Sequence, residues 1–170
     1  IEIISPVLEI PESKVKCIQK MRNKSGFYIA TEDDGIFQLT KAGNLFKVSK
    51  IIISTDFDFT GIQDVYEDSR SNLWLCTKGK GHGLIKMKYS ASGDSIKIIY
   101  FNKANKFAAD DVNTVYEDRE GNIWSGNYGQ GLTLITPKTF SVTKFDNPLF
   151  GNNIFSIYID RQYRLIGTEN

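Results

Sequence analysis

The sequence contains few of the residues from which most catalytic and metal sites are built. Its 170 residues include one histidine, His82, and two cysteines, Cys17 and Cys76, which do not form a CxxC pair. Two cysteines are too few for the disulfide framework of a small secreted domain or for a set of zinc ligands. Both lie in apolar, strand-like runs, which indicates buried packing thiols. No HExxH pattern, Ser-His-Asp spacing or phosphate-binding loop before a helix is present, so we expect no catalytic residue, no metal site and no cofactor.

The sequence also lacks an excess of either charge and any long apolar run. Lysine and arginine total 21 against 20 for aspartate and glutamate, and neither sign forms a long block. This balance argues against a surface for nucleic acid or for an anionic membrane, because either would need a concentrated positive field. No apolar run approaches the roughly 18 to 20 residues of a membrane span, so we expect no membrane contact by this segment. The chain starts at Ile1 without a basic-then-apolar leader, and we interpret it as a piece of a longer protein.

The sequence has an internal repeat and no helical periodicity. No stretch shows the i, i+3, i+4, i+7 apolar spacing of a helix, whereas VYEDSRSNLWLCT at 65–77 returns as VYEDREGNIWSGN at 115–127. Weaker copies occupy 18–31 and 157–168, so successive copies lie roughly 40 to 50 residues apart, a period typical of stacked or radial repeat architectures. The two best copies match at Val65/Val115, Tyr66/Tyr116, Glu67/Glu117, Asp68/Asp118, Asn72/Asn122 and Trp74/Trp124.

Each copy has the internal pattern of four short strands. An alternating run such as NTVYED is followed by a turn with Asp, Gly and Asn, a second extended run, a glycine-bearing turn and two further runs. Four-stranded antiparallel units at this period are typical of β-propeller blades. We therefore predict an all-β fold with blades at 15–57, 61–103 and 111–146, a partial blade at 153–170, and the outer strand of a preceding blade at 1–14. The incomplete last blade favours an open arc, or fragment of a larger propeller, over a complete small ring or an irregular β-sandwich.

The repeated residues are expected to serve the scaffold. Trp74 and Trp124 fall in the second strand of their blades, where a large flat side chain can fill the wedge between neighbouring blades. Asp68 and Asp118 open the first turn, where a carboxylate can accept backbone N–H bonds from two residues further on. The second turn holds a glycine in each copy, which we attribute to a positive φ or to a close approach of blades: Gly35, Gly83 and Gly131.

The stretches YEDREGNIWSGNYGQGL and YEDSRSNLWLCTKGKGHGL resemble the two-component regulator propeller repeat. That pattern has a strand ending in Glu-Asp, a Gly-Asn turn, a Leu-Trp-Ile-Gly-Thr strand and a Gly-Gly-Leu turn. This chain departs from it at Ser71, where the turn usually has glycine, at Cys76 and Ser125, which replace the usual Ile-Gly pair, and in the last copy, which has no Trp. The resemblance implies a periplasmic sensor region of a hybrid two-component system, built from seven-bladed propellers that detect oligosaccharides and signal to a histidine kinase.

One rim of the predicted propeller is the candidate ligand-binding face. The turn between the second and third strands lies on the same rim as the link into the next blade, and loops from several blades converge there. Aromatic, amide and basic side chains at these positions suit sugar recognition, although ordinary solvated loop tips are the alternative. The candidates are Lys78, Lys80, His82, Phe107, Tyr128 and Asn152.

Two other functions remain open at this stage. The propeller could serve as a protein-interaction scaffold without a small ligand. It could also resemble propeller lyases, in which case His82 is the only available base, but it has no second histidine to pair with. As partners, besides an oligosaccharide, we expect the remainder of the parent sensor and self-association of uncovered blade faces.

Overall fold

A computed structural model of the chain describes residues 10, 13–43, 45–52, 60–89, 96–136, 140–143, 153–159 and 164–168. Within these ranges every element is a β-strand except for one short 3₁₀ turn, η1 (Lys103–Asn105), so the predicted all-β fold is confirmed. No helix among the described residues is long and apolar enough to cross a membrane.

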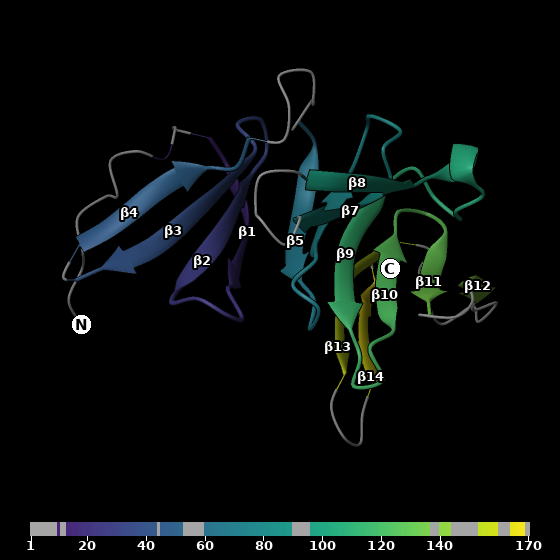
Figure 1. The fold of residues 1–170 in the computed structure, drawn as a ribbon. Helices are drawn as coiled ribbons and strands as arrows, with labels where there is room; N and C mark the ends of the chain where they lie inside the picture. Colours follow the sequence, from purple (N-terminus) through teal and green to yellow (C-terminus); the bar gives the residue numbers. More distant parts are fainter. Residues whose placement is uncertain are drawn as a thin grey trace.

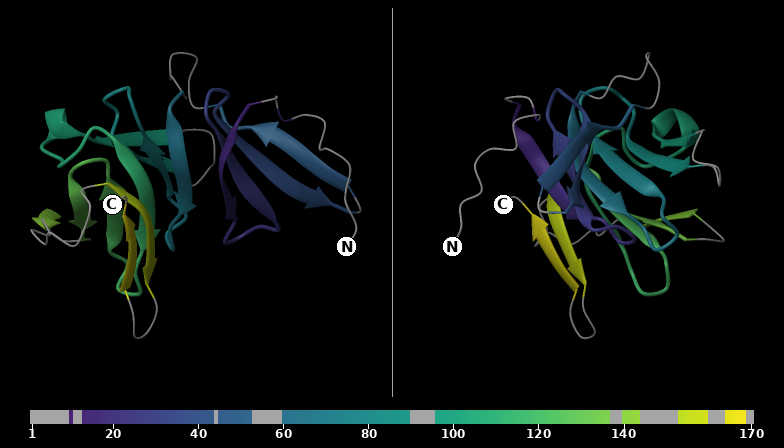
Figure 2. Two further views of the ribbon diagram at one scale, coloured as in Figure 1. Left: turned by 180° about the vertical axis from the view of Figure 1, so that it is seen from behind. Right: turned by 60° about the vertical axis from the view of Figure 1, so that its left-hand side comes forward.

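The strands form successive antiparallel sheets in which neighbours pair in chain order (Figures 1 and 2). The first blade contains β1 (Val15–Lys20), β2 (Gly26–Thr31), β3 (Ile36–Ala42) and β4 (Leu45–Lys50). The second contains β5 (Ile62–Glu67), β6 (Leu73–Thr77), β7 (Leu84–Tyr89) and β8 (Ile96–Phe101). The third contains β9 (Val112–Glu117), β10 (Ile123–Asn127), β11 (Gly131–Ile135) and β12 (Phe140–Thr143), and a two-stranded sheet follows with β13 (Ile154–Ile159) and β14 (Arg164–Thr168).

The register of the first two strands recurs in every sheet. Val15, Ile62, Val112 and Ile154 each pair with the last residue of the second strand, and each is followed by the same one-residue register shift. Equivalent positions can therefore be compared directly from blade to blade. The strand expected at 1–14 lies almost wholly outside the described residues.

The core lies between the blades. One buried cluster joins Tyr28 and Ile36 of the first blade to Val65, Leu75 and other residues of the second. A second cluster joins Trp74, which is 2% exposed, to Val112 and Val115 of the third blade. The first strands of successive blades, β1, β5, β9 and β13, contact one another in turn, and this contact places the sheets side by side as wedges (Figure 1).

The two end blades expose apolar positions that are covered in the inner blades. Ile18 on β1 is 63% exposed, whereas its equivalent on β5, Val65, is 0% exposed against the preceding blade. At the other end, Tyr158 and Leu165 are 58% and 59% exposed, although Leu165 occupies the position of Trp74. The described sheets thus form an arc with an uncovered apolar face at each end.

Candidate ligand-binding rim

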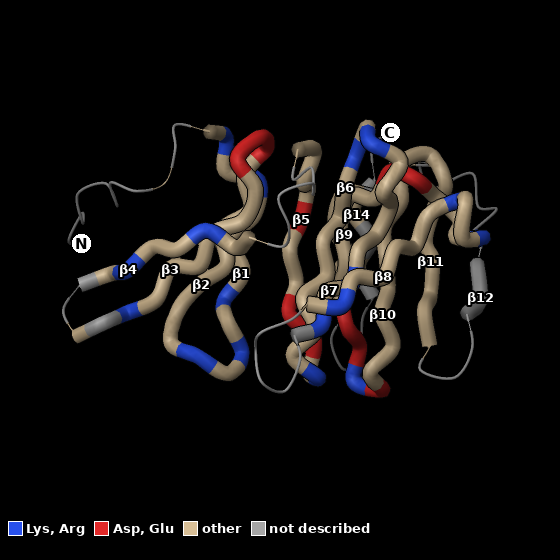
Figure 3. The backbone as a smooth tube through the Cα atoms, turned by 45° about the horizontal axis from the view of Figure 1, so that its top comes forward, with Lys and Arg blue, Asp and Glu red and all other residues tan. Residues whose placement is uncertain are grey.

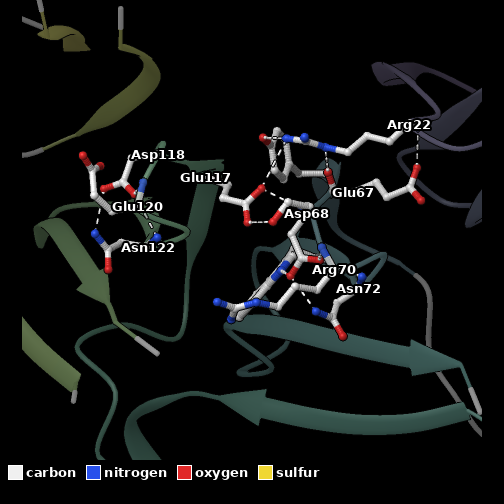
Figure 4. Close-up of polar contacts among 12 residues, drawn as sticks. Arg22, Glu67, Asp68, Arg70, Asn72, Glu117, Asp118, Glu120 and Asn122 are labelled. Carbon is white, nitrogen blue, oxygen red and sulfur yellow. Dashed lines mark hydrogen bonds and ion pairs between the residues drawn. The ribbon is translucent and has the colours of Figure 1, made fainter. Parts of the chain in front are cut away.

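The first turn of the repeat is a closed hydrogen-bonded unit (Figure 4). Asp68 Oδ1 accepts bonds from the backbone N–H groups of Arg70 (2.9 Å) and Asn72 (2.8 Å). Its Oδ2 accepts from Asn72 Nδ2 (2.6 Å) and from the indole Nε1 of Trp74 (2.8 Å). The backbone bonds agree with the sequence-based interpretation. The indole bond was not anticipated, although the joint repetition of Asp, Asn and Trp at fixed spacing was a usable signal.

The third blade repeats the same unit around Asp118. Its carboxylate accepts from Glu120 N (3.1 Å), Asn122 N (2.8 Å), Asn122 Nδ2 (3.0 Å) and Trp124 Nε1 (2.8 Å). Burial alone would raise the pKa of this carboxyl, but the four hydrogen bonds hold the pKa below its ordinary value. The turn therefore contains a charged carboxylate at neutral pH, and this carboxylate ties the second strand to the turn before it.

Repeated glutamates connect the second blade to the first and the third blade to the second. Glu67 Oε2 accepts from the backbone N–H of Arg22 at 2.8 Å, and Glu117 Oε2 accepts from the backbone N–H of Ser69 at 2.7 Å. The Arg22 guanidinium donates to Glu67 O, to Tyr66 Oη and to Glu117 Oε2 (Figure 4). One side chain of the first blade therefore binds both the second and the third blade. Sequence reasoning missed this role, although both glutamates are matched positions of the repeat.

A half-buried aspartate links the first strands of the second and third blades. Asp64 Oδ2 accepts from Thr114 Oγ1 (2.9 Å) and Val115 N (3.2 Å) of the next blade. Burial raises the pKa of Asp64 despite these bonds. Burial and the neighbouring Asp64 raise the pKa of Cys17 to about 12, and Cys76 is fully buried with its pKa also raised by burial. Both thiols are protonated at neutral pH, so neither is an activated nucleophile.

The second turns and the inter-blade links share the opposite rim. Lys78 N donates to Gly61 O at 2.9 Å, and Tyr128 N donates to Asp111 O at 3.0 Å, at equivalent positions of the second and third blades. Gly83 N donates to Asp110 O in the link to the next blade. Gly83 has a φ of 71°, and a Cβ atom there would collide with the carbonyl oxygen of Phe101. Gly131 also has a positive φ, 70°, but nothing crowds it.

Two of the predicted rim residues meet on this surface. Lys78 Nζ lies 3.8 Å from the centroid of the Tyr128 ring, a cation–π contact between two blades. Asp111, in the link before β9, stabilises the turn that contains Lys78, because its Oδ1 accepts a hydrogen bond from Gly79 N at 2.7 Å. Tyr128 remains 40% exposed, so part of its ring is open to a ligand. An aromatic face beside an ammonium group can stack on a sugar ring and donate to its hydroxyl groups.

The surroundings of the other candidates differ. His82 packs against Tyr100 of its own blade, with ring centroids 5.9 Å apart, and Lys80 is exposed in the same turn. Phe107 is only 4% exposed and contacts Phe101 within the core between the second and third blades, so the expectation that its ring lies on the rim surface is wrong. Its apolar ring is more stable in that core than in water. Asn152 lies outside the described residues.

Comparisons with known proteins agree with this repeat and fold. Residues 106–129 match the family model for the two component regulator propeller, so the resemblance is confirmed for the copy that contains the third-blade turn. The structure is similar to the extracellular domain described as that of the hybrid two component system BT3049 from B. thetaiotaomicron, with a TM-score of 0.61 and 15% sequence identity. A second extracellular domain, of system BT4673 from the same organism, matches with a TM-score of 0.62 and 18% identity.

At these identities the similarity concerns the fold. The matches cover 94% of this chain but 19% and 21% of the two extracellular domains, so the chain spans about a fifth of their length. A comparison with curated proteins found no match.

Proposed function

Because the chain carries the two-component regulator propeller repeat, we propose that it is part of the extracytoplasmic sensor region of a hybrid two-component signalling protein. The observation that carries this proposal is the series of consecutive propeller blades around the matched repeat, with a fold similar to extracellular domains of hybrid two-component systems. Blades of this kind supply a rigid frame on which loops can present a ligand site. In the parent protein, occupancy of the site would be passed to a histidine kinase, and the sensor region would lie in the periplasm.

The ligand that best suits the exposed rim is an oligosaccharide. The open part of the Tyr128 ring offers a stacking surface, and Lys78 beside it offers hydrogen-bond donors that are held in place by the cation–π contact. His82, the only candidate base, packs on Tyr100 of its own blade. We therefore assign the rim a binding role and propose that the chain itself is not catalytic.

A calorimetric titration of the chain with a panel of oligosaccharides tests the ligand. We expect Tyr128→Ala to weaken binding of the responsive glycan by about fivefold or more, because loss of one stacked aromatic ring removes roughly 1 kcal/mol or more of contact energy. Phe46→Ala is the matched control, because Phe46 on β4 is similarly exposed at 37% but lies away from the rim. Binding that survives Tyr128→Ala would remove the rim site and leave the sensor role to other blades.

The uncovered end faces favour a second role, as docking surfaces within the parent sensor. Ile18 and Leu165 occupy positions that in the inner blades are buried against a neighbouring sheet. A further blade is the chemically matched partner for each face, because it would bury the same apolar positions in the same register. Where no such blade is present, a second copy of this chain can cover the same faces. A propeller with these contacts and no small ligand is the alternative function.

A further inference from the structure

A cavity lies at the end of the blades opposite the rim that holds Lys78 and Tyr128. It opens between the first and second blades beside their first turns and has a volume of about 540 Å³. Ten residues line it: Met21, Asn23, Lys24, Tyr28, Gln38, Glu67, Arg70, Ser71, Leu73 and Lys88. The cavity therefore belongs to the inter-blade interface and shares no residue with the Lys78–Tyr128 pair.

The floor of the cavity is apolar and its walls are polar. Met21, Tyr28 and Leu73 are all buried members of the core cluster between these two blades. Asn23 and Gln38 add amide groups from the first blade, and Asn23 Nδ2 donates to Ser71 Oγ at 2.7 Å across the interface. A flat apolar surface bordered by a few polar groups is the usual composition of a small-molecule site.

The charge around the cavity is mostly positive. Lys24 and Lys88 line it from different blades and are both exposed, and the salt bridges found among the described residues involve neither of them. Figure 3 shows basic residues in the turn between β1 and β2. The one acidic lining residue, Glu67, is engaged by the backbone N–H of Arg22. Arg70 also lines the cavity, but its guanidinium reaches toward Gly121 of the next blade, so the two lysines supply the available charge.

We propose that this cavity binds a small anion with an apolar ring face. The ring would lie in the cavity against Tyr28, the most exposed of its three core residues at 8%, and its carboxylate would be attracted by Lys24 and Lys88 at the mouth. The choice of a sugar acid as the ligand rests on the proposed carbohydrate-sensing function, whereas the requirement for an anion rests on the cavity alone. Neutral sugars then bind at the rim and acidic ones at the first-turn cavity, on opposite sides of the same blades.

Titration of the full chain with sodium D-glucuronate, D-glucose and sodium acetate separates the contributions of ring and charge. We expect glucuronate to perturb the backbone amide resonances of 21–24 and 69–73 in NMR spectra, and to bind at least about fivefold more tightly than glucose or acetate. The double variant Lys24→Gln/Lys88→Gln should weaken glucuronate binding roughly three- to tenfold, because exposed charge contacts are individually modest. Raising the salt concentration should weaken binding to the unmodified chain in the same direction.

The control double variant is Lys103→Gln/Lys106→Gln, which removes two exposed positive charges from the link before β9, where neither lysine lines the cavity, and should leave the glucuronate Kd within about twofold. Equal binding of glucose and glucuronate, an unchanged Kd in Lys24→Gln/Lys88→Gln, or no perturbation by any of the three probes would overturn the proposal. Amide perturbation near Tyr128 by an oligosaccharide, with none near 21–24 from glucuronate, would reject the cavity and keep the sensor site. The reverse pattern would reject the rim and keep the cavity.

Discussion

At the scale of single residues, Trp74 combines two kinds of stabilisation. Its indole is buried between two blades and also donates a hydrogen bond to the Asp68 carboxylate. Trp124 makes the equivalent bond to Asp118 but is only half-buried. The Asp–Trp pair of the repeat therefore stabilises the two blades to different extents, because burial of the indole ring and its hydrogen bond contribute separately to stability.

Phenylalanine at these positions tests that separation. Trp74→Phe removes the donor and part of the buried ring, so we expect the free energy of unfolding to fall by about 2–4 kcal/mol. Trp124→Phe should lower it by about 1–2 kcal/mol, mainly through the lost hydrogen bond. Urea unfolding followed by circular dichroism measures both values, and equal losses in the two variants would contradict the account.

Ser71 stands where the equivalent turn of the third blade has Gly121, and both adopt a positive φ, 58° and 78°. This conformation strains a residue with a Cβ atom. We expect Ser71→Gly to be more stable than Ser71→Ala by about 1 kcal/mol, because both lack the hydroxyl that accepts from Asn23 and only glycine relieves the backbone. Gly121→Ala should destabilise by about 1–2 kcal/mol. If the two Ser71 variants unfold at the same urea concentration, the strain is not present.

At the scale of elements, the contacts made by the second and third blades each include a glutamate carboxylate that accepts a backbone N–H of the preceding blade. Glu117 accepts from Ser69 N and from Ser69 Oγ at 2.6 Å, and forms a 3.3 Å ion pair with Arg22. Lys20 and Ile159 occupy the equivalent position in the first blade and the last sheet, and neither side chain can accept such bonds. The end sheets thus differ from the inner ones in the chemistry of their attachment as well as in exposure.

Removal of this carboxylate should loosen the second blade from the third. We expect Glu117→Ala to lower the free energy of unfolding by about 2–3 kcal/mol, because it leaves the Ser69 N–H without its acceptor and removes the ion pair between Arg22 and the third blade. Glu120→Ala is the control, since Glu120 is exposed in the same turn and should change stability by less than about 0.5 kcal/mol. Amide hydrogen exchange should show the largest increase along β5 and β9, and an increase spread evenly over all sheets would argue against a local contact.

At the scale of the whole molecule, the arc has complementary ends. The face of β1 corresponds to one that packs against a preceding blade, and the face of β13 and β14 corresponds to one that packs against a following blade. Two copies can therefore associate head to tail, with the last sheet of one against the first blade of the next. Exposed apolar patches of this kind are typical of interaction surfaces.

Light scattering of the isolated chain measures this association. We expect the mean mass to rise with concentration, and Ile18→Lys/Leu165→Lys to keep the chain monomeric over the same range, because a charge would be buried at each end of the contact. Ile52→Lys changes an isoleucine that is 72% exposed in the segment after β4, and it should leave association unchanged. A strictly monomeric parent chain at high concentration would show that the end faces do not attract one another.

Local structure was accessible from the sequence because the hydrogen bonds of the repeated turn join residues that are close in the chain. Asp68, Asn72 and Trp74 lie within seven consecutive residues, so their pattern encodes the turn and the strand after it without help from the rest of the chain. The match of residues 106–129 to the propeller repeat follows from the same short-range pattern.

Only the tertiary structure decided which side chains meet across blades. Arg22 contacts Glu117, which is 95 residues away, and Lys78 contacts the Tyr128 ring. The pattern within a single repeat copy predicts neither pair. The Phe107 side chain lies in the core between the second and third blades, because this apolar environment is more favourable for the ring than the solvated rim. Contacts of this kind depend on the angle and spacing at which one sheet packs on the next, and those quantities are set by the summed packing of many side chains rather than by any short stretch of sequence.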